Sequence, residues 1–330
     1  MTFNKASWLN MTSEKVLDPE LPICDAHHHL MERDGEAYML GEFLGEIREG
    51  HNLRRTIYVD CGKHHRQEGP VQLRPVGETE YARDISGKYS IGSGSVEIAA
   101  GMVAFAELTL GDAVKSVLEA HIQAGGKMVR GVSYPCIFDP DPKVNTRSPA
   151  KIMMDLKFRQ GFACLKQYGL SFDAWLYFHQ LDELKSLAKA FPDTTIIADH
   201  IGGMIGIGSY QGKREENFLR WRSKIADLAA CPNVYVKLGG LGSKRCGWGF
   251  DAREKPPTSE ELAQAWGPYF NWCIEKFSPQ RCMFESNFPP DRLSCSYSIL
   301  WNAFKRIIKD YSITEKNALL HDTAARAYRL

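Results

Sequence analysis

The chain has 330 residues, of which 44% are hydrophobic and 25% are charged, and this composition excludes a disordered protein. The formal net charge is only +1, so the overall charge favours neither a nucleic acid nor an acidic membrane surface as a partner. Nine cysteines are scattered without a Cys-x-x-Cys pair, which indicates neither a zinc ribbon nor a disulfide framework. No signal peptide is recognisable near the start and no apolar run approaches the length of a membrane span, so we expect a cytoplasmic protein.

Residues 1–20 show no clear periodicity, and we expect an N-terminal extension there, followed by a single domain over residues 21–330. Within that domain, short apolar or β-branched runs alternate with longer helical patterns, which is typical of a parallel α/β protein. The eight predicted strands cover residues 23–27, 55–60, 101–108, 128–133, 171–178, 195–199, 234–238 and 281–285. The predicted helices cover residues 112–124, 148–168, 180–190, 215–230, 258–276 and 296–311.

Eight parallel strands with helices between them predict a TIM barrel, an α/β fold that this length accommodates with insertions. An open doubly wound sheet is the alternative, but no Gly-x-Gly-x-x-Gly turn follows an early strand. Residues 63–97 are polar and contain several glycines and prolines, and we expect them to form a long loop over the mouth of the barrel. The Gly-rich stretches 202–216 and 239–258 are expected at the same, C-terminal end.

The segment 23–29, Ile-Cys-Asp-Ala-His-His-His, predicts a buried strand that ends in imidazoles. Alternate side chains share one face of a strand, so we expect His27 and His29 to point the same way and His28 to point the opposite way. Two converging imidazoles can hold a divalent metal ion or transfer protons near neutral pH.

Polar and titratable residues also end most of the other predicted strands, and the active site of a TIM barrel lies at those ends. In chain order these residues are Asp60, Arg130, Tyr134, His179, Asp199, His200, Lys237, Glu285, Asn287 and Asp291. We therefore expect them to gather around one rim of the barrel.

Four of these motifs together resemble the amidohydrolase superfamily. They are His-x-His after the first strand, a histidine ending the fifth, Asp-His-Ile-Gly-Gly ending the sixth and Ser-Asn-Phe-Pro after the eighth. The chain is similar to the amidohydrolase-2 branch, which includes lactone hydrolases acting on 2-pyrone-4,6-dicarboxylate, muconolactones, among them sulfomuconolactone, and sugar lactones. The resemblance covers residues 21–330.

The resemblance implies roles for the four histidines. His27 and His29 match the strand-one metal pair, His179 matches a further metal ligand on strand five, and His200 matches the catalytic imidazole on strand six. It implies at most one divalent metal ion, zinc or manganese, and leaves a metal-free enzyme open.

The residue after the eighth strand departs from the family pattern. The family places an aspartate there, which activates the attacking water, whereas this chain has Asn287. An amide cannot accept a proton from water at neutral pH. Three interpretations stay open: Glu285 or Asp291 acts as the base, a histidine acts as the base, or the protein has lost hydrolytic activity.

The resemblance implies a hydrolase that opens a lactone, or a related cyclic ester or amide, of a small carboxylated substrate by attack of water on a polarised carbonyl. Arg130 is the candidate clamp for a substrate carboxylate, and Tyr134 and Lys237 are further candidates for substrate contact. A buried lysine at position 237 also predicts a carboxylate partner. The alternatives are a non-oxidative decarboxylase of the same branch and an inactive barrel that only binds a ligand. The partner is a small molecule in each case, and the architecture is compatible with a homodimer.

Overall fold

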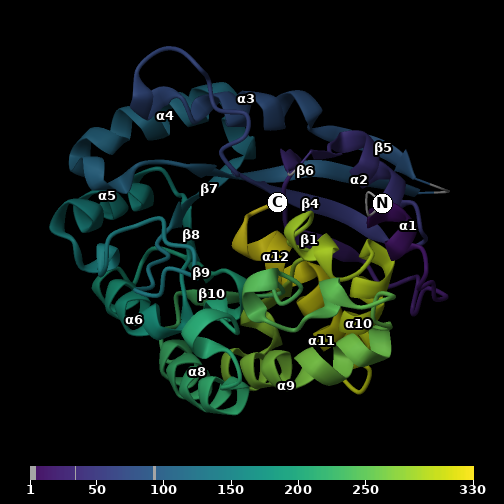
Figure 1. Ribbon diagram of the computed structural model, residues 1–330. Coiled ribbons are helices and arrows are strands. Elements are labelled where there is room, and N and C mark those ends of the chain that lie inside the picture. Colours follow the sequence, from purple (N-terminus) through teal and green to yellow (C-terminus); the bar gives the residue numbers. More distant parts are fainter. Residues whose placement is uncertain (1–4, 34, 92–93) are drawn as a thin grey trace.

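The computed structural model describes residues 5–33, 35–91 and 94–330, and it contains a ring of eight parallel strands surrounded by helices (Figure 1). The strands neighbour one another in the order β1-β4-β6-β7-β8-β9-β10-β11. Their bounds are Ile23–His28 for β1, Leu53–Val59 for β4, Gly94–Phe105 for β6, Val129–Pro135 for β7, Ser171–Trp175 for β8, Ile196–Ala198 for β9, Val234–Leu238 for β10 and Cys282–Phe284 for β11. The predicted TIM barrel fold and its eight parallel strands are confirmed.

The ring closes where the segment after β11 runs beside the end of β1. The amide of His29 donates a hydrogen bond to the carbonyl of Phe288 at 2.8 Å, and the amide of Asn287 donates to the carbonyl of His27 at 2.9 Å. This closure places the polar residues that follow the eighth strand directly beside the strand-one imidazoles.

Helices cover most of the outside of the ring, and the last helix of the chain lies inside it (Figure 1). Their bounds are Leu40–Ile47 for α2, Val76–Ile85 for α3, Val114–Gly125 for α4, Leu156–Gln167 for α5, Leu181–Ala190 for α6, His200–Gly203 for α7, Arg214–Ala229 for α8, Ser259–Phe277 for α9, Tyr297–Ile307 for α10, Ile313–Asn317 for α11 and Thr323–Ala327 for α12. All six predicted helices are present, but α5 begins eight residues later than the predicted start at 148. The Asp155 side chain caps it there, because Oδ1 accepts from the amide of Phe158 at 2.8 Å.

The prediction of one long loop over residues 63–97 is wrong. The segment contains helix α3 and strand β5, Gly87–Ile91, which pairs antiparallel with the start of β6. Glu97 in β6 pairs with Arg55 near the start of β4, so the β5–β6 hairpin lies at the N-terminal end of the barrel, away from the mouth. A second hairpin, formed by β2 (Met31–Arg33) and β3 (Glu36–Tyr38), follows β1 and is also absent from the predicted elements.

The interior of the barrel has an apolar floor. It is formed by Cys24, Ala26, Ile57, Val59, Val103, Ile197 and Met283 from the strands, packed against Ala324, Ala327 and Tyr328. Helix α12 and the residues after it therefore fill this end of the barrel, and Figure 1 shows them inside the ring of strands. Polar groups that lie above this floor are held in a low-dielectric environment, where charge interactions are strong.

The described part of the N-terminal extension packs against the barrel. Its helix α1, Lys5–Leu9, is anchored through Lys5, whose ammonium donates to the carbonyl of Leu293, and through Trp8, whose indole donates to the carbonyl of Arg253 at 2.9 Å. These bonds join the extension to loops that follow β10 and β11.

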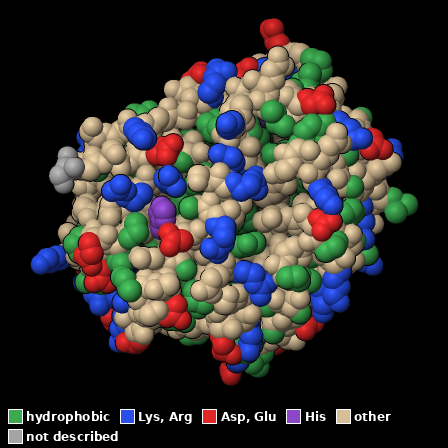
Figure 2. All heavy atoms as spheres, turned by 180° about the vertical axis from the view of Figure 1, so that it is seen from behind, with side chains coloured by type: hydrophobic (Ala, Val, Ile, Leu, Met, Phe, Trp, Pro, Cys, Tyr) green, Lys and Arg blue, Asp and Glu red, His purple; other side chains and the backbone are tan. Residues whose placement is uncertain are grey.

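The surface carries both signs of charge. Figure 2 shows basic and acidic side chains interspersed on one face of the molecule, with apolar side chains scattered among them. None of the helices in residues 5–33, 35–91 and 94–330 combines the length and the apolar character that crossing a lipid bilayer requires.

Candidate active site

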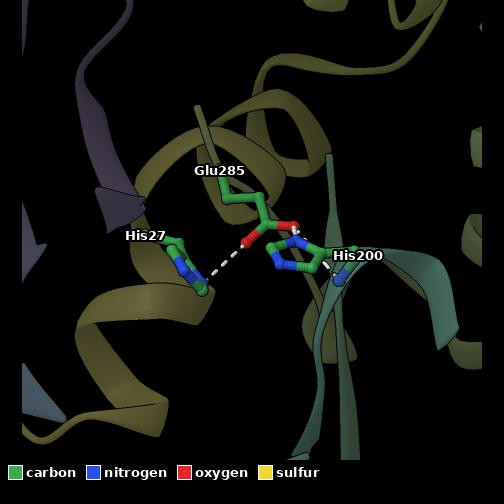
Figure 3. A group of neighbouring side chains, drawn as sticks. All are labelled: His27, His200 and Glu285. Atoms are coloured by element: carbon green, nitrogen blue, oxygen red, sulfur yellow. Dashed lines mark hydrogen bonds and ion pairs between the residues drawn. The ribbon is translucent and has the colours of Figure 1, made fainter. Parts of the chain in front are cut away.

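Glu285 lies between two imidazoles at the C-terminal end of the barrel (Figure 3). Its Oε1 atom accepts hydrogen bonds from Nδ1 of His200 at 2.6 Å and from the His200 amide at 3.1 Å. Its Oε2 atom lies 3.1 Å from Nδ1 of His27. His27 belongs to β1, while His200 and Glu285 follow β9 and β11, and all three side chains are buried. The barrel thus joins three of the predicted site residues from distant parts of the sequence.

The end of β1 brings the strand-one imidazoles together. The pairing of β1 with β4 shifts between residues 25 and 28. The Nε2 atoms of His27 and His29 lie 3.0 Å apart. His28 points away from them and stacks on Phe43 with a ring separation of 4.5 Å. The alternation therefore places two imidazoles at the site and uses the third for packing.

Two consecutive glycines after β10 leave room for this group. A Cβ atom at Gly239 would lie 2.3 Å from Cγ of Glu285, and a Cβ atom at Gly240 would lie 2.4 Å from Cβ of His200. Gly240 also has a φ of +73°, a region that side chains other than glycine rarely adopt. Larger residues here would push apart the imidazole and the carboxylate that form the site.

Lys237 on β10 is fully buried beside His27 and holds two carboxylates. Its Nζ atom lies 2.7 Å from Oδ2 of Asp173, 2.9 Å from Oδ1 of Asp199 and 3.1 Å from Nδ1 of His27. Burial lowers the pKa of Lys237, but the charges of Asp173 and Asp199 outweigh burial and raise it above its ordinary value. The ammonium is therefore charged, and its fully buried position makes it a support for His27 rather than an exposed substrate contact.

The buried group carries more negative than positive charge. Asp173, Asp199 and Glu285 contribute three carboxylates, and Lys237 contributes an ammonium. Burial raises the pKa of Glu285, but the charges and hydrogen bonds of the two imidazoles outweigh burial and hold it well below its usual range. Uncompensated buried charge is costly, so the group favours protons on its imidazoles or a divalent cation.

The two imidazoles differ in their protonation. Burial and the charge of Lys237 lower the pKa of His27, but its hydrogen bonds with Asp199 and Glu285 raise it above the ordinary value. Burial lowers the pKa of His200, and the charge of Glu285 only partly offsets this. His200 is therefore neutral near pH 7. Since its Nδ1 carries the hydrogen donated to Glu285, its Nε2 lone pair can accept a proton.

The same residues fit a divalent metal ion. Ligand atoms of His27, His200 and Glu285 all lie within 4.8 Å of one another. Within the part of the chain that the structure describes, Oδ2 of the buried Asp199 carboxylate accepts no hydrogen bond, so it can serve as a further donor to an ion. Imidazole and carboxylate groups are ligands that zinc and manganese take in proteins.

His179 does not join this group. Strand β8, Ser171–Trp175, ends earlier than predicted, and His179 lies in the short 3-10 turn that follows. Its Nε2 atom bonds to the carbonyl of Phe138 at 2.9 Å, and its ring stacks on Tyr210. His179 thus lies outside the cluster of His27, His200 and Glu285, and its role as a metal ligand stays a prediction.

Asn287 and Asp291 bond to each other. Nδ2 of Asn287 donates to Oδ1 of Asp291 at 2.8 Å, and Oδ2 of Asp291 accepts from the amide of Gly242 at 2.9 Å. Burial raises the pKa of Asp291 to about 7, although the charge of Arg245 and these hydrogen bonds lower it. Of the two carboxylates predicted to replace the family's aspartate, Glu285 is the one that contacts the imidazoles.

Arg130 and Tyr134 occupy places that do not suit the predicted substrate contacts. Arg130 is the second residue of β7 and therefore lies at the N-terminal end of the barrel, where its Cγ atom and Leu330 both border Gly101. The buried ring of Tyr134 packs edge-to-face on Phe158 of α5, in the layer between strands and helices. A residue that binds a substrate carboxylate at the mouth of the barrel would have to lie at the C-terminal end of β7, and Arg130 lies at its N-terminal end.

Two residues that support the site were not among the predicted site residues. Asp173 lies within the buried run 171–175, and a carboxylate in such a run requires a partner, which is a usable signal. Tyr328 donates a hydrogen bond to Asp173 from the C-terminal segment, and nothing in the local sequence indicates that contact.

Arg245 lies beside the site in the Gly-rich loop after β10. Its Nη2 atom donates to the carbonyl of Gly240 at 3.3 Å and its Nη1 atom to Oγ of Ser243 at 3.4 Å, both long hydrogen bonds. Its Nε atom is buried and finds no acceptor among the described residues. Its positive charge acts on His200 and Asp291, since it lowers the pKa of both. A weakly bonded guanidinium in this place can receive an anionic ligand.

Comparisons with known proteins give the chain a family. A family model described as Amidohydrolase matches residues 24–330. The uncharacterized protein y4mH of Sinorhizobium fredii is 32% identical over 296 residues, which are 89% of this chain and 86% of that protein. The L-fucono-1,5-lactonase of Burkholderia multivorans is 29% identical over 180 residues, which are 53% of this chain and 57% of the lactonase.

A solved structure shows the same fold. The crystal structure of an amidohydrolase from Burkholderia multivorans with bound zinc has a TM-score of 0.70 at 21% sequence identity, covering 93% of this chain and 99% of that chain. The family model covers more than nine-tenths of the chain, and the solved structure has the same barrel fold. The chain therefore belongs to the amidohydrolase-2 family.

Proposed function

We propose that this chain is a hydrolase that opens a lactone, or a related cyclic ester or amide, of a small carboxylated substrate. The observation that carries the proposal is the Glu285 carboxylate, which lies within bonding distance of both His200 and His27. Membership of the amidohydrolase-2 family and the partial similarity to a sugar lactonase support a cyclic ester as the substrate.

Hydrolysis of a neutral ester needs a group that takes a proton from the attacking water. His200 supplies this group, because it is neutral near pH 7 and its Nδ1 hydrogen is held by Glu285. Nε2 of His200 accepts the proton, and the Glu285 carboxylate stabilises the imidazolium that forms. Asn287 cannot take this role, since its amide donates to Asp291.

A divalent metal ion, zinc or manganese, fits beside the side chains of His27, His200 and Glu285. His27 and Glu285 would hold it, so that Nε2 of His200 stays free to accept the proton, and when bound it would polarise the substrate carbonyl. Lys237 and Asp199 hold His27 in place from the side of the barrel floor. Elemental analysis of the purified wild-type chain and of Glu285→Gln tests this part of the proposal. If the wild type holds one equivalent of metal that Glu285→Gln loses, the result supports a metal-dependent hydrolase. If the wild type is active without metal, His200 and Glu285 carry out the hydrolysis without a metal ion.

Arg245 is our candidate for the contact with a substrate carboxylate, in place of Arg130. Its guanidinium makes long hydrogen bonds to Gly240 and Ser243 and lies beside His200. Arg245→Met should raise the KM for a carboxylated lactone at least tenfold and leave the KM for a neutral lactone within about twofold. Equal effects on both substrates would contradict the assignment.

A panel of carboxylated and neutral lactones tests the reaction type. Ring opening is followed by proton release with a pH indicator, and CO2 release is measured in parallel with carboxylated aromatic acids. We expect ring opening without CO2. CO2 release without ring opening would identify a decarboxylase, and ligand binding by calorimetry without either reaction would identify an inactive barrel that binds its ligand.

A further inference from the structure

A second cluster of metal-binding side chains lies beside the mouth of the barrel, outside the group described above. Asp60 directly follows β4, His65 lies in the next loop, and Glu78 lies in the first turn of α3. Nε2 of His65 lies 3.1 Å from Oδ2 of Asp60 and 3.6 Å from Oε2 of Glu78. One ligand atom from each of the three residues lies within 4.8 Å of the other two.

The cluster has buried negative charge without a nearby ammonium or guanidinium. The side chain of Glu78 is 0% exposed and that of Asp60 is 5% exposed. Within residues 5–33, 35–91 and 94–330, no Lys or Arg nitrogen lies within 4.0 Å of either carboxylate. Glu78 instead accepts from the hydroxyl of Tyr58 at 3.0 Å and the amide of Cys61 at 2.8 Å, which are neutral donors. The two buried carboxylates thus have no lysine or arginine beside them to compensate their charge.

The spacing of the donors suits a small divalent cation. A tetrahedral zinc ion with bonds of about 2.0–2.1 Å separates its ligand atoms by about 3.3 Å, which is close to the distances from His65 to the two carboxylates. The side chain of His65 is 26% exposed, so the cluster is open to solvent on the imidazole side. The thiol of Cys61 donates to the same Glu78 carboxylate at 3.1 Å.

We propose that Asp60, His65 and Glu78 form a second divalent-metal site of the zinc type. A bound ion would fasten the loop after β4 to helix α3. This loop leaves the barrel at Val59, whose carbonyl holds Nδ1 of His29 at 2.8 Å, so the second site stabilises the rim next to the active-site imidazoles. The proposal does not depend on the proposed hydrolase activity, because the two clusters share no residue.

Zinc stoichiometry of the full chain tests the proposal. The protein is stripped with a chelator, dialysed, titrated with zinc chloride alone and analysed for bound metal. The variants are His65→Ala, His200→Ala, which impairs the active-site group, and the two combined. His321→Ala is the matched control, because His321 contacts one carboxylate, Asp322, at 2.9 Å.

We expect His65→Ala to bind one equivalent less than wild type, or to bind that equivalent at least tenfold more weakly. His200→Ala should keep the His65-dependent equivalent, the double variant should lose it, and His321→Ala should behave like wild type. Zinc should also raise the Tm of wild type more than that of His65→Ala. Equal zinc binding by His65→Ala and wild type would overturn the proposal. If the wild type binds a single equivalent of zinc and that equivalent depends on His65, the result would support this second site and contradict a metal ion in the active site.

Discussion

Glu285→Gln is the substitution that examines the proposed chemistry most closely. The carboxylate is ionised, because the neighbouring imidazoles hold its pKa well below the usual range. Glutamine keeps the shape but loses the charge and can offer only one oxygen to two imidazoles 2.6 Å and 3.1 Å away. His200 then loses the partner that fixes its tautomer and stabilises its protonated form. A positioned proton acceptor contributes a factor of about 10² to 10⁴, so kcat should fall by that amount.

The same substitution has a smaller effect on stability. A hydrogen bond to a charged group contributes about 1.5–3 kcal/mol. The site holds surplus negative charge, and losing one carboxylate charge relieves part of that repulsion. We therefore expect a net loss of about 1–3 kcal/mol in the free energy of unfolding.

Lactone hydrolysis and urea unfolding measure the two effects of Glu285→Gln. Glu107→Gln is the matched control, since Oε1 of Glu107 accepts from the hydroxyl of Tyr134 at 2.9 Å outside the imidazole group. Its kcat should stay within about threefold of wild type, because it removes no proton acceptor from the site. A folded Glu285→Gln enzyme with the wild-type kcat would contradict the proposed role of the Glu285 carboxylate.

Four further substitutions test separate parts of the account. Lys237→Met leaves two buried carboxylates unpaired and should lower the free energy of unfolding by about 3–5 kcal/mol in urea; a loss below about 1 kcal/mol would contradict the buried ion-pair network. His29→Ala should reduce kcat at least about 100-fold with an unchanged circular dichroism spectrum, because this imidazole faces its strand-one partner at 3.0 Å; wild-type turnover would remove it from the site. Asn287→Asp places a second carboxylate against Asp291, so Tm should fall and kcat should not rise; a large gain in kcat would show that the amide replaces an ordinary water-activating aspartate. Burial raises the pKa of Asp291 in the folded state to about 7. Between about pH 4 and pH 7 the folded state therefore keeps a proton on Asp291 that the unfolded state has released, so this group lowers the free energy of unfolding as pH rises through that range. Asp291→Asn should make the decline of Tm across that window shallower, and an unchanged slope would contradict the shift.

The eight strands of the barrel could be predicted because each is a short apolar run followed by polar residues. The hydrophobic pattern and the composition of these runs were sufficient to predict the strands, since both faces of a barrel strand are buried. The β5–β6 hairpin could not be found in this way. Strand β5 alternates half-buried and exposed side chains at the edge of the fold, and its polar sequence is typical of a loop.

The site could be predicted in part. His27, His200 and Glu285 lie at strand ends, and the closed ring brings those ends together. The positions of the Arg130 and His179 side chains were harder to predict, because they depend on the exact residues at which β7 begins and β8 ends. A displacement of a few residues moves a side chain to the opposite end of the barrel or into the following turn.

The cluster of Asp60, His65 and Glu78 shows a different limit. His65 and Glu78 lie in the stretch interpreted as one long loop, where no spacing rule indicates that they meet. The first turn of α3 brings Glu78 back to the end of β4, and only the packing of the helix on the barrel creates that proximity.

The tautomer of His200 is the most direct test of the account, and nitrogen NMR of histidine-labelled protein measures it, with His200→Ala identifying the signal. At pH 7 we expect a neutral ring with its hydrogen on Nδ1, and this pattern should be lost in Glu285→Gln. A ring protonated on both nitrogens, or one with its hydrogen on Nε2, would contradict the claim that the carboxylate prepares this imidazole to take a proton from water.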